Sequence, residues 1–390
     1  MRRTELLQEI KMMRFREAFA EWKAGRLTQQ EAARLLGVCE RSFRRYCSRY
    51  DLGGLAGLKD GRLGRPSHLR APQHESWELV KSYEARHKGW TAKHFYAWYQ
   101  RAGGKRSYTW VKKTLQKAGL VRKAPHRGAH RKRRDRAPLP GMLLHQDGSR
   151  HEWVPGQYWD LIVTMDDATN EHYDMRFVEE EGTRSSFEGV EAVIRAKGLF
   201  SSLYTDRGAH YWVTKREGEA VDKTRPTQFG RAMQQLGIEM IPAYSPEARG
   251  RSERAFRTHQ ERLVRELAMH GITTMAGANT YLAEHYRVAF NLEFSQPSLE
   301  AGSAFVPCTT DLKEVLCEHV ERKVGGDNCV TFFGVTLQIS KQQYRCNLVG
   351  VPVRIHRYTD DTLAVFHGPR CLGRYRAEGE PIVQETSVAA

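Results

Sequence analysis

The sequence predicts a multidomain protein: α-helical helix-turn-helix modules first, an α/β unit with a mixed sheet in the middle, and a small β-barrel last. Two observations predict this order. Apolar residues recur at helical spacing in the first third, and strand-like apolar runs follow from residue 140 onward. With 390 residues, 40% of them hydrophobic and 28% charged, the chain has room for roughly two to four folded domains.

Several classes of protein are disfavoured by composition. No apolar run approaches the roughly 18 residues of a membrane span, so no membrane partner is expected. Glu5 and Glu9 fall where a signal peptide would carry its apolar core, which argues against secretion. Seven cysteines, an odd number without a Cys-x-x-Cys pair, are typical of a reducing cytosol. A cytoplasmic protein is therefore expected.

Positive charge is concentrated in the first third of the chain. Of the 62 Lys and Arg residues, 34 lie in residues 1–140 together with 12 of the 46 Asp and Glu, so this part has a net charge of +22. The remaining 28 and 34 give residues 141–390 a net charge of −6. This asymmetry predicts a polyanionic partner, because phosphate neutralisation with counterion release favours binding. A solvated basic face is the alternative.

Residues 1–52 are expected to form a helix-turn-helix. Thr28 and Glu31 form a capping-box pattern before a short helix, and Gly37 suits its end. A second helix over residues 40–50 carries its aromatic residues on one face and is expected to enter a DNA major groove. The expected DNA contacts are Arg41, Ser42, Arg44 and Arg45. A hairpin that only packs is the alternative.

A glycine-rich linker over residues 53–72, or an arginine-bearing arm for a minor groove, precedes a second helical module. This winged-helix or helix-turn-helix-like module spans residues 73–121, with helices predicted at 75–87, after a cap at Thr91, and after a cap at Ser107. Lys112 and Lys113 of the last helix are expected to contact DNA. Residues 122–137 are expected to be an extended basic linker lying on phosphates through Arg131, Lys132, Arg133 and Arg134.

Residues 138–290 read as the α/β unit. Strands predicted at 142–147, 158–166 and 171–178 form an antiparallel meander. A helix at 185–197 leads to a strand at 199–206, expected to run parallel to the first. A short strand at 238–242 then precedes a long helix that begins near Glu253. This interleaving predicts a mixed sheet covered by helices.

Three carboxylates stand in distinct settings within this unit. Asp147 and Asp206 end apolar, strand-like runs, and Glu253 opens the long helix. Carboxylates brought together repel one another unless cations lie between them, and Mg²⁺ prefers such oxygen ligands. Two ions roughly 3.5–4 Å apart can stabilise the attacking and leaving oxygens of a phosphodiester displacement. The expected cofactor is therefore two Mg²⁺ ions, with Mn²⁺ as a possible substitute.

The settings of these acids resemble a known family. Tyr204-Thr205-Asp206-Arg207-Gly208, and Tyr244-Ser245-Pro246 followed by Gly250-Arg251-Ser252-Glu253-Arg254, are similar to segments around the second and third acids of DDE transposases and retroviral-type integrases. With the helix-turn-helix in front, the chain resembles bacterial insertion-sequence transposases of the IS481 or ISNCY type. The resemblance implies an RNase H-like core and a metal-binding triad of Asp147, Asp206 and Glu253. It also implies nicking and strand transfer of double-stranded DNA, at least a dimer, and a place at the bacterial nucleoid.

The spacing departs from the family pattern, because 46 residues separate Asp206 from Glu253. The excess falls between Trp212 and Thr227 and is expected to be a surface insertion. Asp166 and Asp167 compete for the role of first acid, but a turn or capping role is expected for them. Around Glu253, four arginines are expected either to contact DNA phosphates or only to offset the acids' charge; these are Arg249, Arg251, Arg254 and Arg257.

The C-terminal part is predicted to hold a polar connector at residues 291–326, a small β-barrel at 327–376 and a disordered tail at 377–390. Two other functions remain open. The chain could be a DNA-binding regulator derived from such an element, with its chemistry lost. It could also be an RNase H-type nuclease without strand transfer, although the helix-turn-helix modules disfavour this.

Overall fold

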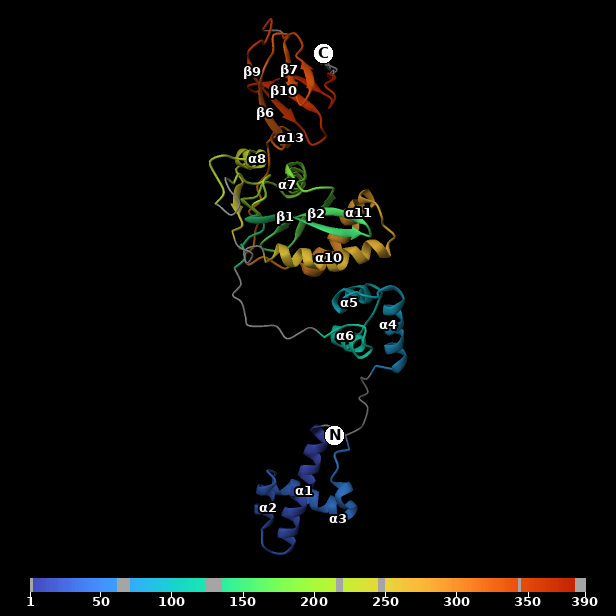
Figure 1. Cartoon of the computed structure of the whole chain (residues 1–390). Coiled ribbons are helices and arrows are strands. Elements are labelled where there is room, and N and C mark those ends of the chain that lie inside the picture. The colour runs from blue at the N-terminus through green and yellow to red at the C-terminus, as the bar shows by residue number, and fades with distance from the viewer. Residues whose placement is uncertain are drawn as a thin grey trace, which may run out of the picture. The chain divides into compact units, whose positions relative to one another are not determined.

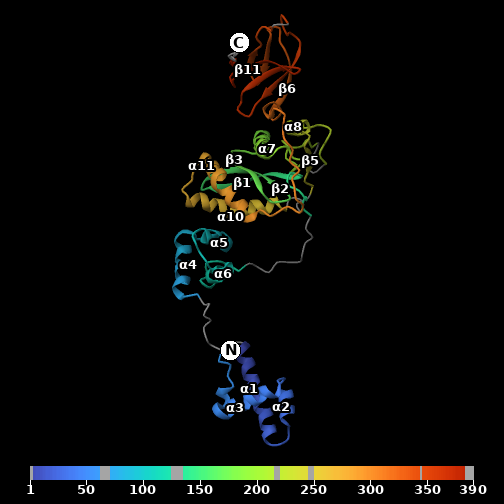
Figure 2. The same cartoon turned by 180° about the vertical axis from the view of Figure 1, so that it is seen from behind.

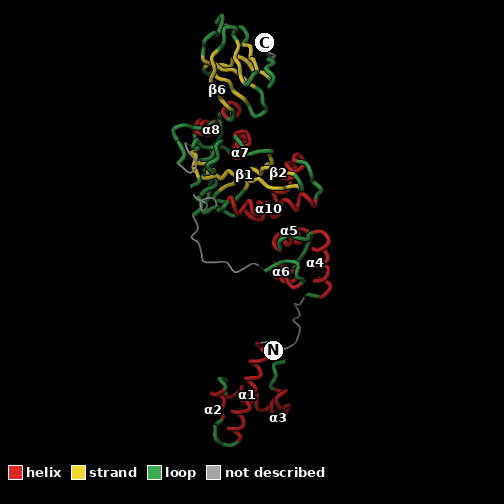
Figure 3. Tube along the Cα trace, in the orientation of Figure 1, coloured by secondary structure: helices red, strands yellow, loops and turns green. Residues whose placement is uncertain are grey.

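The computed structural model describes residues 3–61, 71–123, 135–214, 220–244, 250–342 and 345–382 (Figures 1 and 3). The chain divides into two units, Met1–Lys81 and Ser82–Ala390. None of the helices in the described ranges is long and apolar enough to cross a membrane. The four residues Arg131, Lys132, Arg133 and Arg134, predicted to contact DNA, lie outside the described residues.

The first unit is a three-helix cluster followed by the start of a fourth helix. It contains α1 (Arg3–Lys23), α2 (Gln29–Leu35), α3 (Glu40–Gly57) and the start of α4 (Gln73–Arg86). The predicted capping box is confirmed, because the Thr28 side chain accepts a hydrogen bond from the Glu31 amide, and the Glu31 carboxylate accepts one from the Thr28 amide at 2.7 Å. Gly37 has a φ of 65°, the left-handed conformation expected after the helix. The predicted helix-turn-helix is therefore present.

The aromatic face predicted for α3 is its buried face. Phe43 is fully buried and packs against Phe15 of α1, with ring centroids 5.9 Å apart. Tyr46 and Tyr50 pack partly buried against the same cluster. The helix continues to Gly57, seven residues past its predicted end, although Gly54 departs from helical geometry with a φ of 55°. Glycine accommodates that φ without the steric cost of a side chain, so the element kinks there and continues through residues 51–56, which are exposed.

The second unit begins with the helical module. The predicted caps are confirmed: Thr91 caps α5 (Ala92–Arg101) and Ser107 caps α6 (Tyr108–Lys117). A buried hydrogen bond joins this module to the α/β unit, because His94 Nε2 lies 2.7 Å from Glu266 Oε1. The second Glu266 oxygen accepts a hydrogen bond from the Tyr281 hydroxyl at 2.7 Å.

A five-stranded mixed sheet forms the centre of the second unit, in the order β3-β2-β1-β4-β5. The antiparallel meander and the parallel pairing of β4 with β1 are both confirmed. The strands are β1 (Leu143–Val154), β2 (Gln157–Asp166), β3 (His172–Val178), β4 (Ser202–Thr205) and β5 (Glu239–Pro242). One expectation is wrong: Asp147 lies inside β1 and does not end it, because the pairing with β2 continues to Val154.

Helices cover both faces of this sheet (Figures 1 and 2). On one face, Leu144 packs with α7 (Thr183–Lys197) and α8 (Gln228–Leu236). On the other face, Trp153 packs with residues of α10 and the helices after it. These helices are α10 (Ser252–Met269), α11 (Met275–Tyr281), the π-helical turn η1 (Leu282–Tyr286) and α12 (Arg287–Phe294). Residues of β1 therefore alternate between the two faces.

The C-terminal part contains a four-stranded antiparallel sheet, β11-β10-β9-β6, and a separate hairpin, β7-β8. The elements are α13 (Leu312–Val315), β6 (Glu318–Lys323), β7 (Cys329–Phe332), β8 (Val335–Gln338), β9 (Pro352–Arg357), β10 (Leu363–His367) and β11 (Arg370–Tyr375). The sheet and hairpin share one apolar core. The predicted closed barrel is not confirmed, because β6 and β11 are the open edges of the four-stranded ladder.

Two further expectations for this part need correction. Strand β6 lies in the segment predicted as a connector; its polar sequence suits an edge strand with one exposed face, which hides it from a search for apolar runs. Residues 377–382, predicted to be disordered, include a turn in which the Arg376 amide donates to the Glu380 carbonyl. The chain then returns to β11 through a bridge between Tyr375 and Pro381.

Candidate functional site

Asp147 and Asp206 lie on neighbouring parallel strands at the same level. The pairing of β1 with β4 runs from Leu143 opposite Ser202 to His145 opposite Tyr204. Asp147 and Asp206 each follow two residues later, and Asp206 is the first residue after β4. The structure therefore brings these two acids to adjacent positions at the end of the β1–β4 ladder.

The two carboxylates are held by local backbone amides. Asp147 is buried, and its Oδ1 accepts a hydrogen bond from the Gly148 amide at 3.1 Å. Asp206 is half-buried, and its Oδ1 accepts one from the Gly208 amide at 2.8 Å. These local contacts orient each carboxylate relative to its own strand end.

Glu253 lies in the first turn of α10, on the helix face that lies over β1. Near the start of this helix Arg251 binds Asp167, whose amide donates to the Leu143 carbonyl. Farther along, Gln260 Nε2 donates to Ser149 Oγ at 3.0 Å. Glu253 falls between these two anchors and, seven residues before Gln260, on the same helical stripe.

The odd-numbered residues of β1 face this helix. Ser149 accepts a hydrogen bond from Gln260 of α10, and alternation places Asp147, two residues before it, on the same face of the strand. Asp147 thus lies between the same two anchors as Glu253. The structure brings the third acid to the side of the sheet on which Asp147 lies, and Glu253 is exposed there.

Two further groups border the acids and were not identified from the sequence. Glu181, between β3 and α7, lies directly against Gly148: a Cβ at residue 148 would be 2.2 Å from Glu181 Oε2. His210 Nε2 lies 3.6 Å from Glu181 Oε1. Burial lowers the pKa of His210, and the nearby Asp206 carboxylate opposes that effect. The sequence could not have shown which acid of the run Glu179-Glu180-Glu181 turns inward, because that depends on the loop's path.

Tyr211 supports the convergence of these charges. Its hydroxyl is buried, donates to Gln146 Oε1 at 3.1 Å and accepts from Ser186 Oγ at 3.1 Å. Burial raises the pKa of Tyr211 well above its ordinary value, and the carboxylates of Glu181, Asp147 and Asp206 add to the rise. Three acids from three separate segments therefore act on the pKa of one side chain.

A buried network beside the site takes up the two competing acids. Asp166 accepts hydrogen bonds from the Gly141 and Thr169 amides at 2.9 and 2.8 Å, which confirms its expected role in a turn. The Asp167 carboxylate accepts a hydrogen bond from His145 Nε2 at 2.7 Å and forms an ion pair with the Arg251 guanidinium.

Burial alone would raise the pKa of Asp167, but the hydrogen bonds from His145, the Ala137 amide and Arg251 hold it well below the ordinary value. Arg251 was expected among the arginines available to DNA. It is instead committed to this pair, which fixes the start of α10.

The predicted DNA contacts in the described ranges lie on helix surfaces. On α3, Arg41, Arg44 and Arg45 are exposed and Ser42 is half-buried. Lys113 of α6 is exposed, whereas Lys112 is half-buried and lies 5.9 Å from the centre of the Tyr108 ring. On α10 the two exposed arginines are Arg254 and Arg257, and the Arg257 guanidinium lies 3.5 Å from the Glu261 carboxylate.

Comparison with known proteins places the chain among related sequences. Residues 17–75 match a family described as winged helix-turn helix. The transposase y4bF of Sinorhizobium fredii is 30% identical over 349 residues, which cover 87% of this chain and 75% of that protein. The transposase for insertion sequence IS1202 of Streptococcus pneumoniae is 24% identical over 345 residues, covering 79% of this chain and 74% of that protein.

Solved structures give two more distant likenesses. A chain of the simian T-cell lymphotropic virus intasome in complex with PP2A regulatory subunit B56 gamma is 14% identical, with a TM-score of 0.34 over 79% of this chain and 99% of that chain. The HTLV-2 integrase catalytic core domain in complex with magnesium is 14% identical, with a TM-score of 0.30 over 38% of this chain and 87% of that chain.

Proposed function

We propose that this chain, which belongs to the bacterial insertion-sequence transposases, binds the ends of a DNA element and catalyses metal-dependent nicking and strand transfer. One observation carries the proposal. Asp147 and Asp206 occupy adjacent positions on paired strands, and Glu253 lies on the helix face over the same strand. Double-stranded DNA, as element end and as target, is the substrate.

The donor set suits hard divalent cations. Asp147 and Asp206 supply oxygen ligands, Glu253 completes the set, and Glu181 adds a carboxylate beside Gly148. Acids gathered in this way repel one another unless positive charge lies between them. When bound, two Mg²⁺ ions, or Mn²⁺ in their place, would activate the attacking oxygen and stabilise the leaving oxygen of a phosphodiester displacement.

The protein's own residues position the site and the DNA. The Asp167–Arg251 pair fixes the start of α10, and the Gln260–Ser149 hydrogen bond fixes the helix against β1. Exposed Arg254 and Arg257 bind phosphates near the scissile bond. The sheet order, an antiparallel meander followed by two parallel strands, agrees with an RNase H-like core.

Sequence-reading falls to the helical modules in this proposal. Arg41, Ser42, Arg44 and Arg45 present polar groups on the second helix of the helix-turn-helix, the helix that enters the major groove in such motifs. Lys112 and Lys113 of α6 add contacts to phosphates. Because two element ends must be joined, the active form is at least a dimer, and its DNA substrate would place it at the bacterial nucleoid.

The test is a cleavage and strand-transfer assay on DNA that carries the element's ends. Asp147→Asn, Asp206→Asn and Glu253→Gln should each lower strand transfer by at least about a hundredfold, since each removes a charged group that acts on the transition state. End binding should be retained, and chelation should abolish activity until Mg²⁺ is restored.

Glu261→Gln is the matched control, because Glu261 is a partly exposed acid two turns farther along α10 and should be dispensable. Full activity in any of the three triad variants would remove that residue from the site. Absence of metal-dependent cleavage by the wild-type chain would favour the regulator hypothesis, and cleavage of RNA–DNA hybrids alone would favour the nuclease.

A further inference from the structure

A second cluster of metal-ligating side chains lies at the base of the C-terminal sheet, far along the chain from the acids. Cys317 immediately precedes β6, His319 lies on β6 and His356 lies on β9. The antiparallel pairing places His319 directly opposite His356. The three donor atoms, one sulfur and two imidazole nitrogens, lie within 4.8 Å of one another.

Hydrogen bonds to Glu314 occupy one ring nitrogen of each histidine and leave the lone pair of the other ring nitrogen available to a ligand. His356 Nδ1 donates to Glu314 Oε2 at 2.8 Å, which leaves Nε2 as the basic nitrogen. That Nε2 atom is buried and has no hydrogen-bond partner in the part of the chain that the structure describes, although His356 is only 5% exposed. An orphaned buried nitrogen is costly unless something binds it.

The two other donors share an anchor. His319 Nε2 donates to the Glu314 carbonyl at 3.1 Å, so its Nδ1 carries the free lone pair. The Cys317 thiol, 1% exposed, donates weakly to the same carbonyl at 3.4 Å. A carboxylate behind one imidazole and a carbonyl behind the other are the partners that commonly orient histidine ligands of metals.

We propose that Cys317, His319 and His356 bind one borderline divalent cation, Zn²⁺ by preference, as a structural site distinct from the acids of the α/β unit. One thiolate and two neutral imidazoles favour Zn²⁺ over Mg²⁺, which prefers oxygen ligands. The thiol proton leaves as the metal–sulfur bond forms. The fourth position is taken by water.

Only small movements are needed to form the site. Bond lengths of about 2.3 Å to sulfur and about 2.0 Å to nitrogen put tetrahedral donors roughly 3.3–3.6 Å apart, so the cluster must contract by about 1 Å. The two imidazoles are stacked, with centroids 3.9 Å apart, and must open toward a shared ion by side-chain rotation.

The surroundings provide access and partial charge balance. A pocket of about 70 Å³ borders Cys317 and is also lined by the acids Glu318 and Asp361. Arg231 donates to the Cys317 carbonyl, so a positive charge lies nearby. The negative charges of the Glu314 carboxylate and the Cys317 thiolate would offset the positive charges of Arg231 and of the ion.

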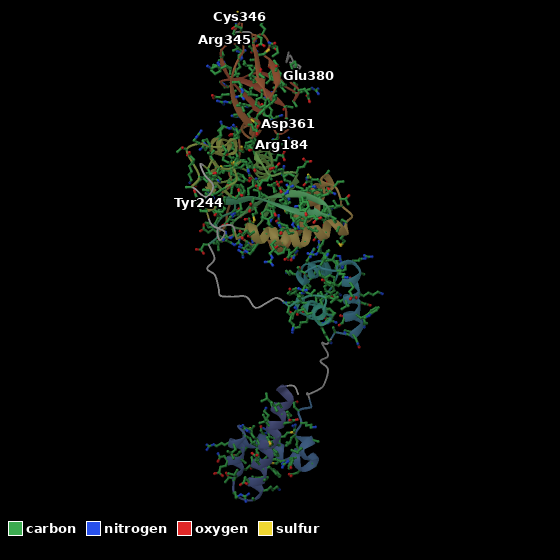
Figure 4. The ribbon with its side chains drawn as sticks, in the orientation of Figure 1. Arg184, Tyr244, Arg345, Cys346, Asp361 and Glu380 are labelled. Carbon is green, nitrogen blue, oxygen red and sulfur yellow. The ribbon has the colours of Figure 1, made fainter. Side chains whose placement is uncertain are left out.

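The position of the cluster in the fold indicates what a bound ion would stabilise. The His319 backbone exchanges two hydrogen bonds with Gln228 of α8, at 2.8 and 2.9 Å. Arg184 of α7 pairs with Asp361, in the loop between β9 and β10, at 2.9 Å (Figure 4). A cation held by β6 and β9 would therefore brace the C-terminal sheet where it meets helices of the α/β unit.

The test uses the full-length chain, stripped with a chelator and titrated with Co²⁺ and then Zn²⁺. One equivalent of Co²⁺ should produce a thiolate-to-cobalt charge-transfer band that Zn²⁺ removes and Mg²⁺ does not. The acids of the other site have no sulfur and cannot produce this band. Cys317→Ser should abolish it, and Cys371→Ser, at an exposed cysteine, should keep it.

Zn²⁺ should also raise the melting temperature of the wild-type chain and of Cys371→Ser, but not of Cys317→Ser. A wild-type titration without the band would overturn the proposal, whatever the variants do. So would a band that persists in Cys317→Ser. Circular dichroism of each variant, recorded without metal, separates loss of the ligand from loss of the fold.

Discussion

At the scale of single residues, a chain of three hydrogen bonds runs through the core between the sheet and α10. The Tyr286 hydroxyl donates to His259 Nδ1 at 3.0 Å. His259 and His172 share a hydrogen bond between their Nε2 atoms at 3.1 Å. His172 Nδ1 donates to the Asn170 carbonyl at 2.9 Å. With both imidazoles neutral, each donor in this series meets one acceptor, and an added proton forces the hydrogen bonds to rearrange.

These three hydrogen bonds predict that the folded protein is less stable in acid. Burial lowers the pKa of His172 to about 4, and that of His259 well below its ordinary value. The unfolded chain therefore binds protons first, and stability falls as the pH drops below about 6.5. For His172 alone the loss at pH 4 should be about 3 kcal/mol relative to neutral pH.

Urea unfolding at several pH values measures this effect. His172→Gln should flatten the pH dependence between 6.5 and 4, whereas His285→Gln, at an exposed histidine, should leave it unchanged. An equal pH dependence in wild type and His172→Gln would contradict the assignment.

Residues with strong local settings could be singled out from the sequence. Asp147 lies in a strand, Asp206 follows one and Glu253 opens a helix, and the structure brings these elements together. Glu181 and His210 have no such setting, because a loop decides where they point. Arg251 looked like its neighbouring arginines, and only the tertiary contact with Asp167 separates it from them.

At the scale of elements, the Thr28 capping box sets the start of α2. Thr28→Ala removes a hydrogen-bond acceptor that satisfies a helix amide, so α2 should lose about 1 kcal/mol of local stability. Hydrogen exchange of the α2 amides in the full-length chain measures this change. Ser48→Ala, which removes a hydroxyl that only returns to the Arg44 carbonyl in mid-helix, is the control.

Helix α10 connects the helical module to the α/β unit through Glu266. Burial tends to raise the pKa of this carboxyl, but hydrogen bonds from His94 and Tyr281 leave it lowered. Glu266→Ala should cost about 3–5 kcal/mol, because it strands buried polar partners.

Denaturant unfolding of the full-length chain provides the comparison for Glu266→Ala. Glu284→Ala, at an exposed acid on η1, should cost little. Equal stabilities of the two variants would show that the buried pair contributes nothing to the fold.

Elements with a strong internal pattern were predicted well. Thr91 and Ser107 cap their helices as expected, and the meander strands carry continuous or alternating apolar residues. The second half of β1 and strand β6 were missed because both are polar on one face, and pairing with a neighbour makes them strands. The extension of α3 past Tyr50 was missed because its three glycines have low helix propensity.

At the scale of the whole molecule, the charge distribution predicts salt-sensitive DNA binding. The net charge is +16, and its excess lies in the first third of the sequence. Arg44→Ala and Arg45→Ala should each weaken binding to element ends by roughly 1–3 kcal/mol, and a phosphate contact should lower the salt slope by about 1. Fluorescence anisotropy across a salt series measures both quantities.

Arg26→Ala is the matched control for these variants, because Arg26 is exposed but paired with Glu21 at 2.6 Å. Binding that is equally weakened by all three substitutions would point to charge alone rather than to the α3 surface. The order of helical and α/β parts along the chain could be predicted from charge and periodicity. The open C-terminal sheet could not, since barrel closure depends on pairing between edges that share no local signal.

The anchoring of the acids has a consequence for how such chains are compared. The pairing of β4 with β1 fixes the position of Asp206, and the contacts of α10 with β1 fix the position of Glu253. The 46 residues that separate them include α8 and β5, which belong to the same fold, but the segments that connect these elements do not set the position of either acid. Related chains are free to lengthen or shorten those connecting segments without moving the chemistry, and a search that demands a fixed number of residues between the two acids would overlook molecules built like this one.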